Sequence, residues 1–247
     1  MDFELLQLII LFAFIAILYS SAGFGGGSSY LAVLALFETS FSNIRMLALL
    51  CNITVVAGSV ILLYRNKHLN LKKTIPLIIL SIPMAYLGGR FKISQNTFFI
   101  ILGISLLAAS IIMFFFNPKE SKSNQLEIPH FGTGLIGGAI GLLSGIVGIG
   151  GGIFLSPILH FSRWAAVKTI SAATALFILV NSIAGLIGQI SVHGFTLDPI
   201  YALSLMLSVF IGGQIGVRLS IHKLSPDLIK KITAILIFLV AIRVLYY

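Results

Sequence analysis

Two glycine clusters are the part of this sequence best suited to bind a ligand. The run 23–27 (GFGGG) recurs 125 residues later as 148–152 (GIGGG), each time after an apolar segment and before a short apolar run. Glycines leave backbone N–H groups accessible, and a helix that follows them carries partial positive charge at its N-terminus. The spacing therefore predicts an anion-binding site at each cluster. The candidate residues are Gly23, Gly25, Gly26, Gly27, Gly148, Gly150, Gly151 and Gly152.

A second interpretation is that these glycines only let helices pack closely, as small residues do in membranes. We favour anion binding, because glycine is denser here than packing requires. Ser28 and Ser29 follow the first cluster and add hydroxyl donors, whereas Ile153 and Phe154 follow the second. The two clusters are therefore not expected to be equivalent.

Two asparagines are the next candidates for contact with a ligand. Asn52 is matched by Asn181, 129 residues later, and each lies well inside an apolar segment. Buried amides in lipid need partners, so these two either clamp helices together or face a substrate path. We assign the nearby polar residues to helix packing: Thr54, Ser59, Thr174, Ser182 and Gln189.

The composition places these residues in a membrane. Of 247 residues, 58% are hydrophobic and 9% charged, against roughly a quarter charged in a soluble domain. Charge-free runs such as 46–64 and 169–197 reach the roughly 20 residues that a membrane-crossing helix needs. The net charge of +9 comes from basic residues in short loops without the aromatic pattern of a nucleic-acid reader. We predict an all-α polytopic protein whose partners are the lipid bilayer and a small anion, with no nucleic acid.

The chain divides into two repeats of five helical segments, 1–116 and 130–247, joined by a polar linker, 117–129. The second segment of each repeat has only about ten residues and covers half of a ~30 Å hydrocarbon core. Each glycine cluster is therefore expected at the tip of a broken hairpin near the middle of the membrane. The predicted segments are 5–22, 28–37, 46–64, 74–89, 96–116, 131–147, 153–161, 168–190, 199–217 and 226–246.

Charge predicts the orientation. If the loop with Lys67 is cytoplasmic, the loops on that side hold 12 basic residues and the other side 4, including Arg45. Five segments are an odd number, so the second repeat enters from the opposite side and the repeats are inverted, as in many secondary transporters. The linker is then cytoplasmic and both termini are extracytoplasmic.

Acidic residues and catalytic motifs exclude several functions. All 7 acids lie in loops or at segment ends, whereas a cation or proton pump normally keeps a carboxylate in the membrane. Neither glycine cluster completes a nucleotide-binding motif, and Cys51 is the single cysteine. Ser144 lies in a protease-like context, but no histidine is placed mid-helix to act as its base. We predict no cofactor, no metal, no catalytic residue and no enzymatic activity.

The order of motifs resembles the TauE/SafE sulfite exporter family across nearly the whole chain. The residues that carry the likeness are the two glycine clusters, Ala172-Ala173-Thr174 leading to Asn181, His193-Gly194, and the run 212–219. The resemblance implies a bacterial inner-membrane permease for sulfite, sulfoacetate or related organosulfur anions. It also makes Thr174 and Asn181 candidates for the substrate path.

The expected function is secondary transport of a small anion, such as sulfite or an organosulfonate, by alternating access. The alternatives are an anion channel of the same fold and a permease for an uncharged metabolite. The sequence indicates no oligomeric state.

Overall fold

The computed structural model describes residues 3–21, 23–37, 41–115, 130–222 and 226–246, and every regular element in those ranges is an α-helix. The all-helical prediction is confirmed, and each predicted segment corresponds to one helix with ends shifted by at most five residues. The predicted linker lies outside the described residues. The helices are α1 (Phe3–Ser21), α2 (Gly27–Leu36), α3 (Phe41–Arg65), α4 (Leu71–Arg90), α5 (Gln95–Phe115), α6 (His130–Val147), α7 (Gly152–Phe161), α8 (Val167–His193), α9 (Pro199–His222) and α10 (Pro226–Leu245).

Helix lengths agree with a membrane protein. Five described stretches are long and apolar enough to cross a bilayer: Phe3–Ser21, Asn43–Arg65, Leu71–Arg90, Val167–His193 and Pro199–Leu219. By contrast, α2 and α7 have 10 residues each, which is about 15 Å of helix and half of the hydrocarbon core. Large apolar side chains on the outer surface, such as Ile79 and Ile200, are exposed, as lipid-facing residues are.

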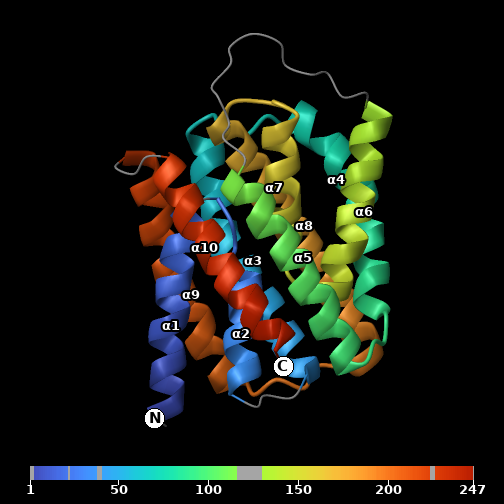
Figure 1. Ribbon diagram of the computed structural model, residues 1–247, viewed down its shortest axis with the longest axis vertical. Helices are drawn as coiled ribbons and strands as arrows, with labels where there is room; N and C mark the ends of the chain where they lie inside the picture. Colours follow the sequence, from blue (N-terminus) through green and yellow to red (C-terminus); the bar gives the residue numbers. More distant parts are fainter. Residues whose placement is uncertain (1–2, 22, 38–40, 116–129, 223–225, 247) are drawn as a thin grey trace.

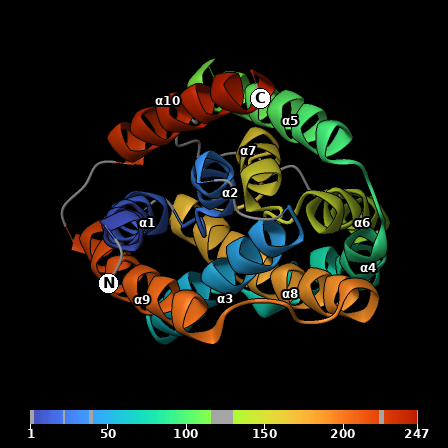
Figure 2. The same cartoon turned by 90° about the horizontal axis from the view of Figure 1, so that it is seen from below.

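The two short helices lie inside the bundle. Seen from below in Figure 2, α2 and α7 are surrounded by the longer helices, with α5 and α10 along one side and α3, α8, α4 and α9 along the other. Each short helix packs on the long helix that follows it, α2 on α3 and α7 on α8. In Figure 1, α2 lies in the lower half of the molecule and α7 in the upper half.

The packing of the two halves corresponds helix by helix. The pair α1–α9 has its counterpart in α6–α4, and α2–α10 has its counterpart in α7–α5, while α3 packs on α8 and α5 on α10. Helices α1 and α6 run in opposite directions, and both chain ends lie at the lower end of Figure 1. Two inverted repeats would produce this arrangement.

Hydrogen bonds identify which connections share an end of the bundle. At one end, Lys73 Nζ near the start of α4 donates to the backbone oxygen of Trp164, just before α8, at 3.5 Å. At the other end, the Thr196 hydroxyl donates to Asn43 Oδ1 at 2.6 Å, joining the α8–α9 connection to the start of α3.

The expectation that Arg45 lies in a loop is wrong, because α3 begins at Phe41 and Arg45 is only 2% exposed.

Many glycines outside the clusters bring helix backbones together. On α6, a β-carbon added to Gly137 would collide with the backbone oxygen of Leu77 on α4, and one added to Gly145 with that of Ala85. On α9, Gly212 and Gly216 lie against α1 backbone oxygens in the same way. These glycines therefore make α4–α6 and α1–α9 close pairs.

Replacing Gly137 with alanine is expected to destabilise the protein by about 1–3 kcal/mol, because the added methyl group overpacks a backbone contact. Gly134, on the same helix, is the matched control, since its added β-carbon would meet only the Pro76 oxygen at 3.6 Å. Gly134→Ala should be neutral, or stabilising by about 0.5–1 kcal/mol through helix propensity. Thermal unfolding of the two purified variants in detergent measures the difference, and equal melting temperatures would contradict the close packing.

Candidate functional site

Each glycine cluster forms a tip between a long helix and a short one. Helix α2 follows Gly26 at φ 88°, and α7 follows Gly151 at φ 78°, both in the left-handed region that glycine adopts without strain. Neither glycine has a side chain to cap the helix that it precedes. The first N–H groups of α2 and α7 also lack intrahelical acceptors, so they remain available as donors at the two tips.

Asn52 on α3 lies against both tips. A β-carbon added to Gly25 or Gly27 would collide with its amide, and one added to Gly150 would lie 3.2 Å from its Nδ2. The side chain is 0% exposed, and neither Nδ2 nor Oδ1 has a hydrogen-bond partner among the described residues. A buried amide without partners is costly, so this one offers an unused donor and acceptor at the contact between the tips.

Helix α8 supplies two hydroxyl groups beside the second tip. Ser182 Oγ would lie 2.7 Å from a β-carbon added to Gly150, and the Thr174 methyl group 3.0 Å from one added to Gly152. Both side chains are buried, and neither hydroxyl oxygen has a described hydrogen-bond partner. Thr174, Ile178 and Ser182 are spaced four residues apart, so they share one face of α8.

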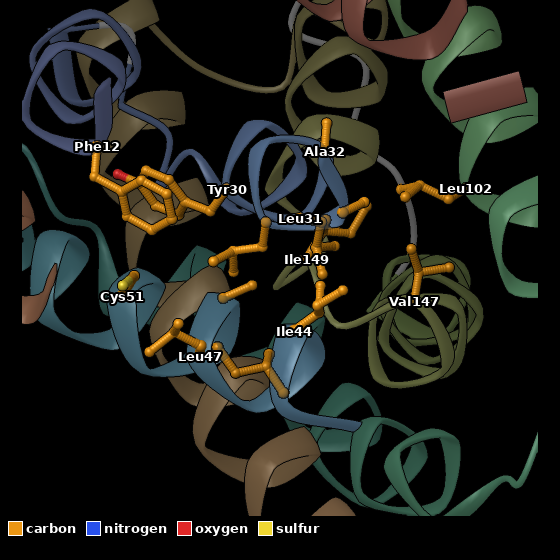
Figure 3. Close-up of a cluster of buried hydrophobic side chains, with 14 of the residues drawn as sticks. Phe12, Tyr30, Leu31, Ala32, Ile44, Leu47, Cys51, Leu102, Val147 and Ile149 are labelled. Atoms are coloured by element: carbon orange, nitrogen blue, oxygen red, sulfur yellow. The ribbon is translucent and has the colours of Figure 1, made fainter. Parts of the chain in front are cut away.

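The serines of the first tip differ in what they can offer a ligand. Ser28 is fully buried, whereas the Ser29 hydroxyl donates to Tyr19 Oη at 2.7 Å. The proton of Ser29 is therefore already used, and this residue does not act as the free donor that the sequence suggested. Tyr30 lies against Gly26 of the same tip and is stacked on Phe12 of α1, with ring centroids 4.6 Å apart (Figure 3).

Asn181 does not occupy the position that Asn52 has. Its Nδ2 donates to the backbone oxygen of Phe177 at 2.8 Å, which is a bond within α8. The residue that lies against Gly150 and Gly152, as Asn52 lies against Gly25 and Gly27, is Ile178. In contact terms Asn52 therefore corresponds to Ile178, 126 residues later, and the two tips face different chemistry.

The same interval relates the outer contacts of the tips. Gly23 lies against Ser171 in the first turns of α8, and Gly148 lies against Arg45 in the first turns of α3, again 126 residues apart. Ile149 of the second tip belongs to the buried core together with Leu31 of α2 (Figure 3). Each hairpin tip thus contacts helices of both halves.

Arg45 is the functional candidate that the sequence reasoning placed wrongly. Its Nη2 donates to the backbone oxygen of Gly145 at 3.1 Å, and its guanidinium lies 5.8 Å from the centre of the Phe98 ring. Extending the predicted segment 46–64 by one helical turn toward its N-terminus would have placed Arg45 inside the helix. The acids whose side chains are described, Glu4 and Asp198, are exposed. The described interior around the tips therefore combines neutral donors with a buried cation, a set of groups that suits an anion.

Comparison with known proteins agrees with this arrangement. Residues 8–244 match the family described as Sulfite exporter TauE/SafE. The chain is 30% identical over 252 residues to the probable membrane transporter protein y4hK of Sinorhizobium fredii, covering 100% of both chains. It is 28% identical to the probable membrane transporter protein MJ0441 of Methanocaldococcus jannaschii, covering 92% of this chain and 91% of that one. No solved structure matches it. The chain therefore belongs to the TauE/SafE sulfite exporter family of multi-pass membrane transporters.

Proposed function

We propose that this transporter is a secondary permease for a small anion, such as sulfite or an organosulfonate, and that its two inverted halves work by alternating access. The observation that carries the proposal is the Asn52 amide, which is buried without partners between the two glycine tips. An amide nitrogen, two hydroxyl groups and two helix N-termini all offer hydrogen-bond donors to the same region.

The chemistry of these groups favours an oxyanion. Each helix N-terminus contributes about half a positive charge, and its first N–H groups can donate to ligand oxygens. Asn52 Nδ2, Ser182 and Thr174 add neutral donors, so no full charge has to be desolvated beside the ligand. Sulfite and sulfonate groups present several oxygen acceptors around one centre, which matches donors that converge from both tips.

The contacts of the two hairpin tips support alternating access. Gly23 contacts Ser171 in the second half, and Gly148 contacts Arg45 in the first. Rocking one half against the other would therefore move each tip relative to the long helix that it touches, while Asn52 stays between the tips. We further propose that the protein lies in the cell inner membrane with its linker, 117–129, in the cytoplasm and both termini outside.

Asn52→Leu is expected to lower the affinity for sulfite at least about tenfold, because a hydrogen bond to a charged group is worth about 1.5–3 kcal/mol. Without the anion, the variant should be as stable as the wild type or more so, since it loses an unpartnered buried amide. Thr54→Val is the matched control, because Thr54 Oγ1 already donates to the Leu50 oxygen within α3 at 2.9 Å. Sulfite-dependent thermal stabilisation, measured against chloride at equal ionic strength, gives both quantities. Severe unfolding of Asn52→Leu without anion would instead identify Asn52 as a helix clamp.

Transport in proteoliposomes should saturate with sulfite concentration and accelerate when unlabelled sulfite is present on the opposite side. Alternating access predicts this counterflow, because the loaded carrier returns faster than the empty one. A channel of the same fold would show no trans-acceleration, so its absence would reject the transporter mechanism. Competition by a panel of anions and uncharged metabolites separates the anion proposal from a permease for uncharged compounds.

Cysteine labelling of intact cells tests the orientation on a Cys51→Ser background. Phe195→Cys, in the exposed α8–α9 connection, should react with a membrane-impermeant reagent from outside, whereas Lys119→Cys should not react. The positive-inside distribution of basic residues requires this result. Labelling of position 119 from outside would contradict the inverted arrangement.

A further inference from the structure

Gln189 on α8 is a buried amide that the site at the tips does not use. The side chain is 0% exposed, and neither Nε2 nor Oε1 has a hydrogen-bond partner among the described residues. It follows Ser182 by seven residues, or two helical turns, so it continues the face of α8 that lies beside the second tip. The polar groups of that face therefore extend beyond the tips toward the end of α8.

Contacts between α8 and its neighbours place Arg45 at the level of Gln189. A β-carbon on Gly185 would lie 3.9 Å from Leu49 Cδ1 on α3 and 3.6 Å from Gly145 Cα on α6. Because α3 and α8 are antiparallel, one turn beyond this contact brings Gln189 on α8 level with Arg45 on α3. The same helices meet again further on, where Thr196 donates to Asn43 at 2.6 Å.

The guanidinium of Arg45 is directed to the same place. Its Nη2 donates to the oxygen of Gly145, the residue whose Cα packs on Gly185, one turn before Gln189. A guanidinium keeps its positive charge while it is hydrogen-bonded to protein, so Arg45 can attract an oxyanion electrostatically from this position. A cation and a neutral amide therefore lie within about one helical turn of the same contact between α3, α6 and α8.

The opposite end of the α3–α8 contact is apolar. There Leu63 of α3 packs on Ala172 and Ala175 of α8, with Val60 and Leu69 against this cluster. Leu63 lies 126 residues before Gln189, the interval that also relates Arg45 to Ser171. The position equivalent to Gln189 in the first half is thus apolar, and the combination of an amide with a charge lies at one end of the α3–α8 contact, the end at which α3 begins and α8 ends.

We propose that Gln189 and Arg45 form a second anion-binding station, one step from Asn52 and Ser182 toward that end. The inference rests on the proposed anion transport. It adds two residues that select for negative charge at the end of the bundle where α3 begins and α8 ends. Gln189 donates hydrogen bonds to the anion through Nε2, and Arg45 supplies the fixed positive charge. The apolar cluster around Leu63 closes the α3–α8 contact on the other side.

Sulfite counterflow in proteoliposomes tests this station through the KM of single variants. Gln189→Leu and Arg45→Met should raise the KM at least about tenfold, the loss expected when a hydrogen bond to a charged group is removed. Gln189→Glu should raise the KM further, because its carboxylate repels the anion while the side chain keeps nearly the same volume. Arg45→Lys should retain more affinity than Arg45→Met. The matched control is Gln214→Leu, which removes an amide that lies against Gly58 rather than against a glycine of either tip, and should keep the wild-type KM.

A KM within twofold of wild type for both Gln189→Leu and Arg45→Met would overturn the station. If Asn52→Leu still loses sulfite binding in that case, the proposed function stands without it. Absence of both counterflow and sulfite-dependent stabilisation in the wild type would overturn the two proposals together.

A second measurement decides the question if the leucine or methionine variants do not fold. Gln189→Cys on a Cys51→Ser background should react faster with an anionic methanethiosulfonate than with a cationic one of similar size. Sulfate should slow the anionic reaction, because it occupies the same donors without cleaving disulfides. Faster reaction of the cationic reagent would contradict a station that selects for negative charge.

Discussion

The structure depends on the fact that lipid offers no hydrogen bonds to a broken helix. A ten-residue helix that starts inside a bilayer needs its first N–H groups covered by protein or by a ligand. The bundle meets this requirement by enclosing α2 and α7, with α5 and α10 along one side and α3 and α8 along the other (Figure 2). The two tips then face a common buried region, and the Asn52 side chain lies against both.

Glycine has two separate physical roles in this protein. On α6 and α9 it removes a side chain so that one helix can rest on the backbone oxygens of another, as Gly137 rests on Leu77. At the tips it adopts positive φ, as at Gly26, and an added β-carbon would meet mainly side chains, such as Asn52 at Gly25. The packing glycines allow the long helices to approach closely, and the tip glycines leave backbone donors uncovered by side chains of their own.

The two halves share a frame but not a chemistry. Positions related by 126 residues make equivalent contacts with the tips, yet they pair Asn52 with Ile178 and Arg45 with Ser171. The position equivalent to Gln189 is likewise Leu63, which belongs to an apolar cluster. The two halves therefore have the same helix packing, but the side chains at equivalent contacts differ.

The sequence by itself determined the helices, because hydrophobic run length and glycine breaks are local properties. It placed every segment to within a few residues, and it predicted Asn52 and both tips as candidates for ligand binding. Only the tertiary structure decided which neighbouring side chain faces a tip. Successive helical residues differ by about 100° in direction, so Ser182 meets Gly150 while Asn181 bonds back to Phe177. The position of Arg45 likewise depended on packing, since burial of a cation requires the Gly145 oxygen from a helix one hundred residues away.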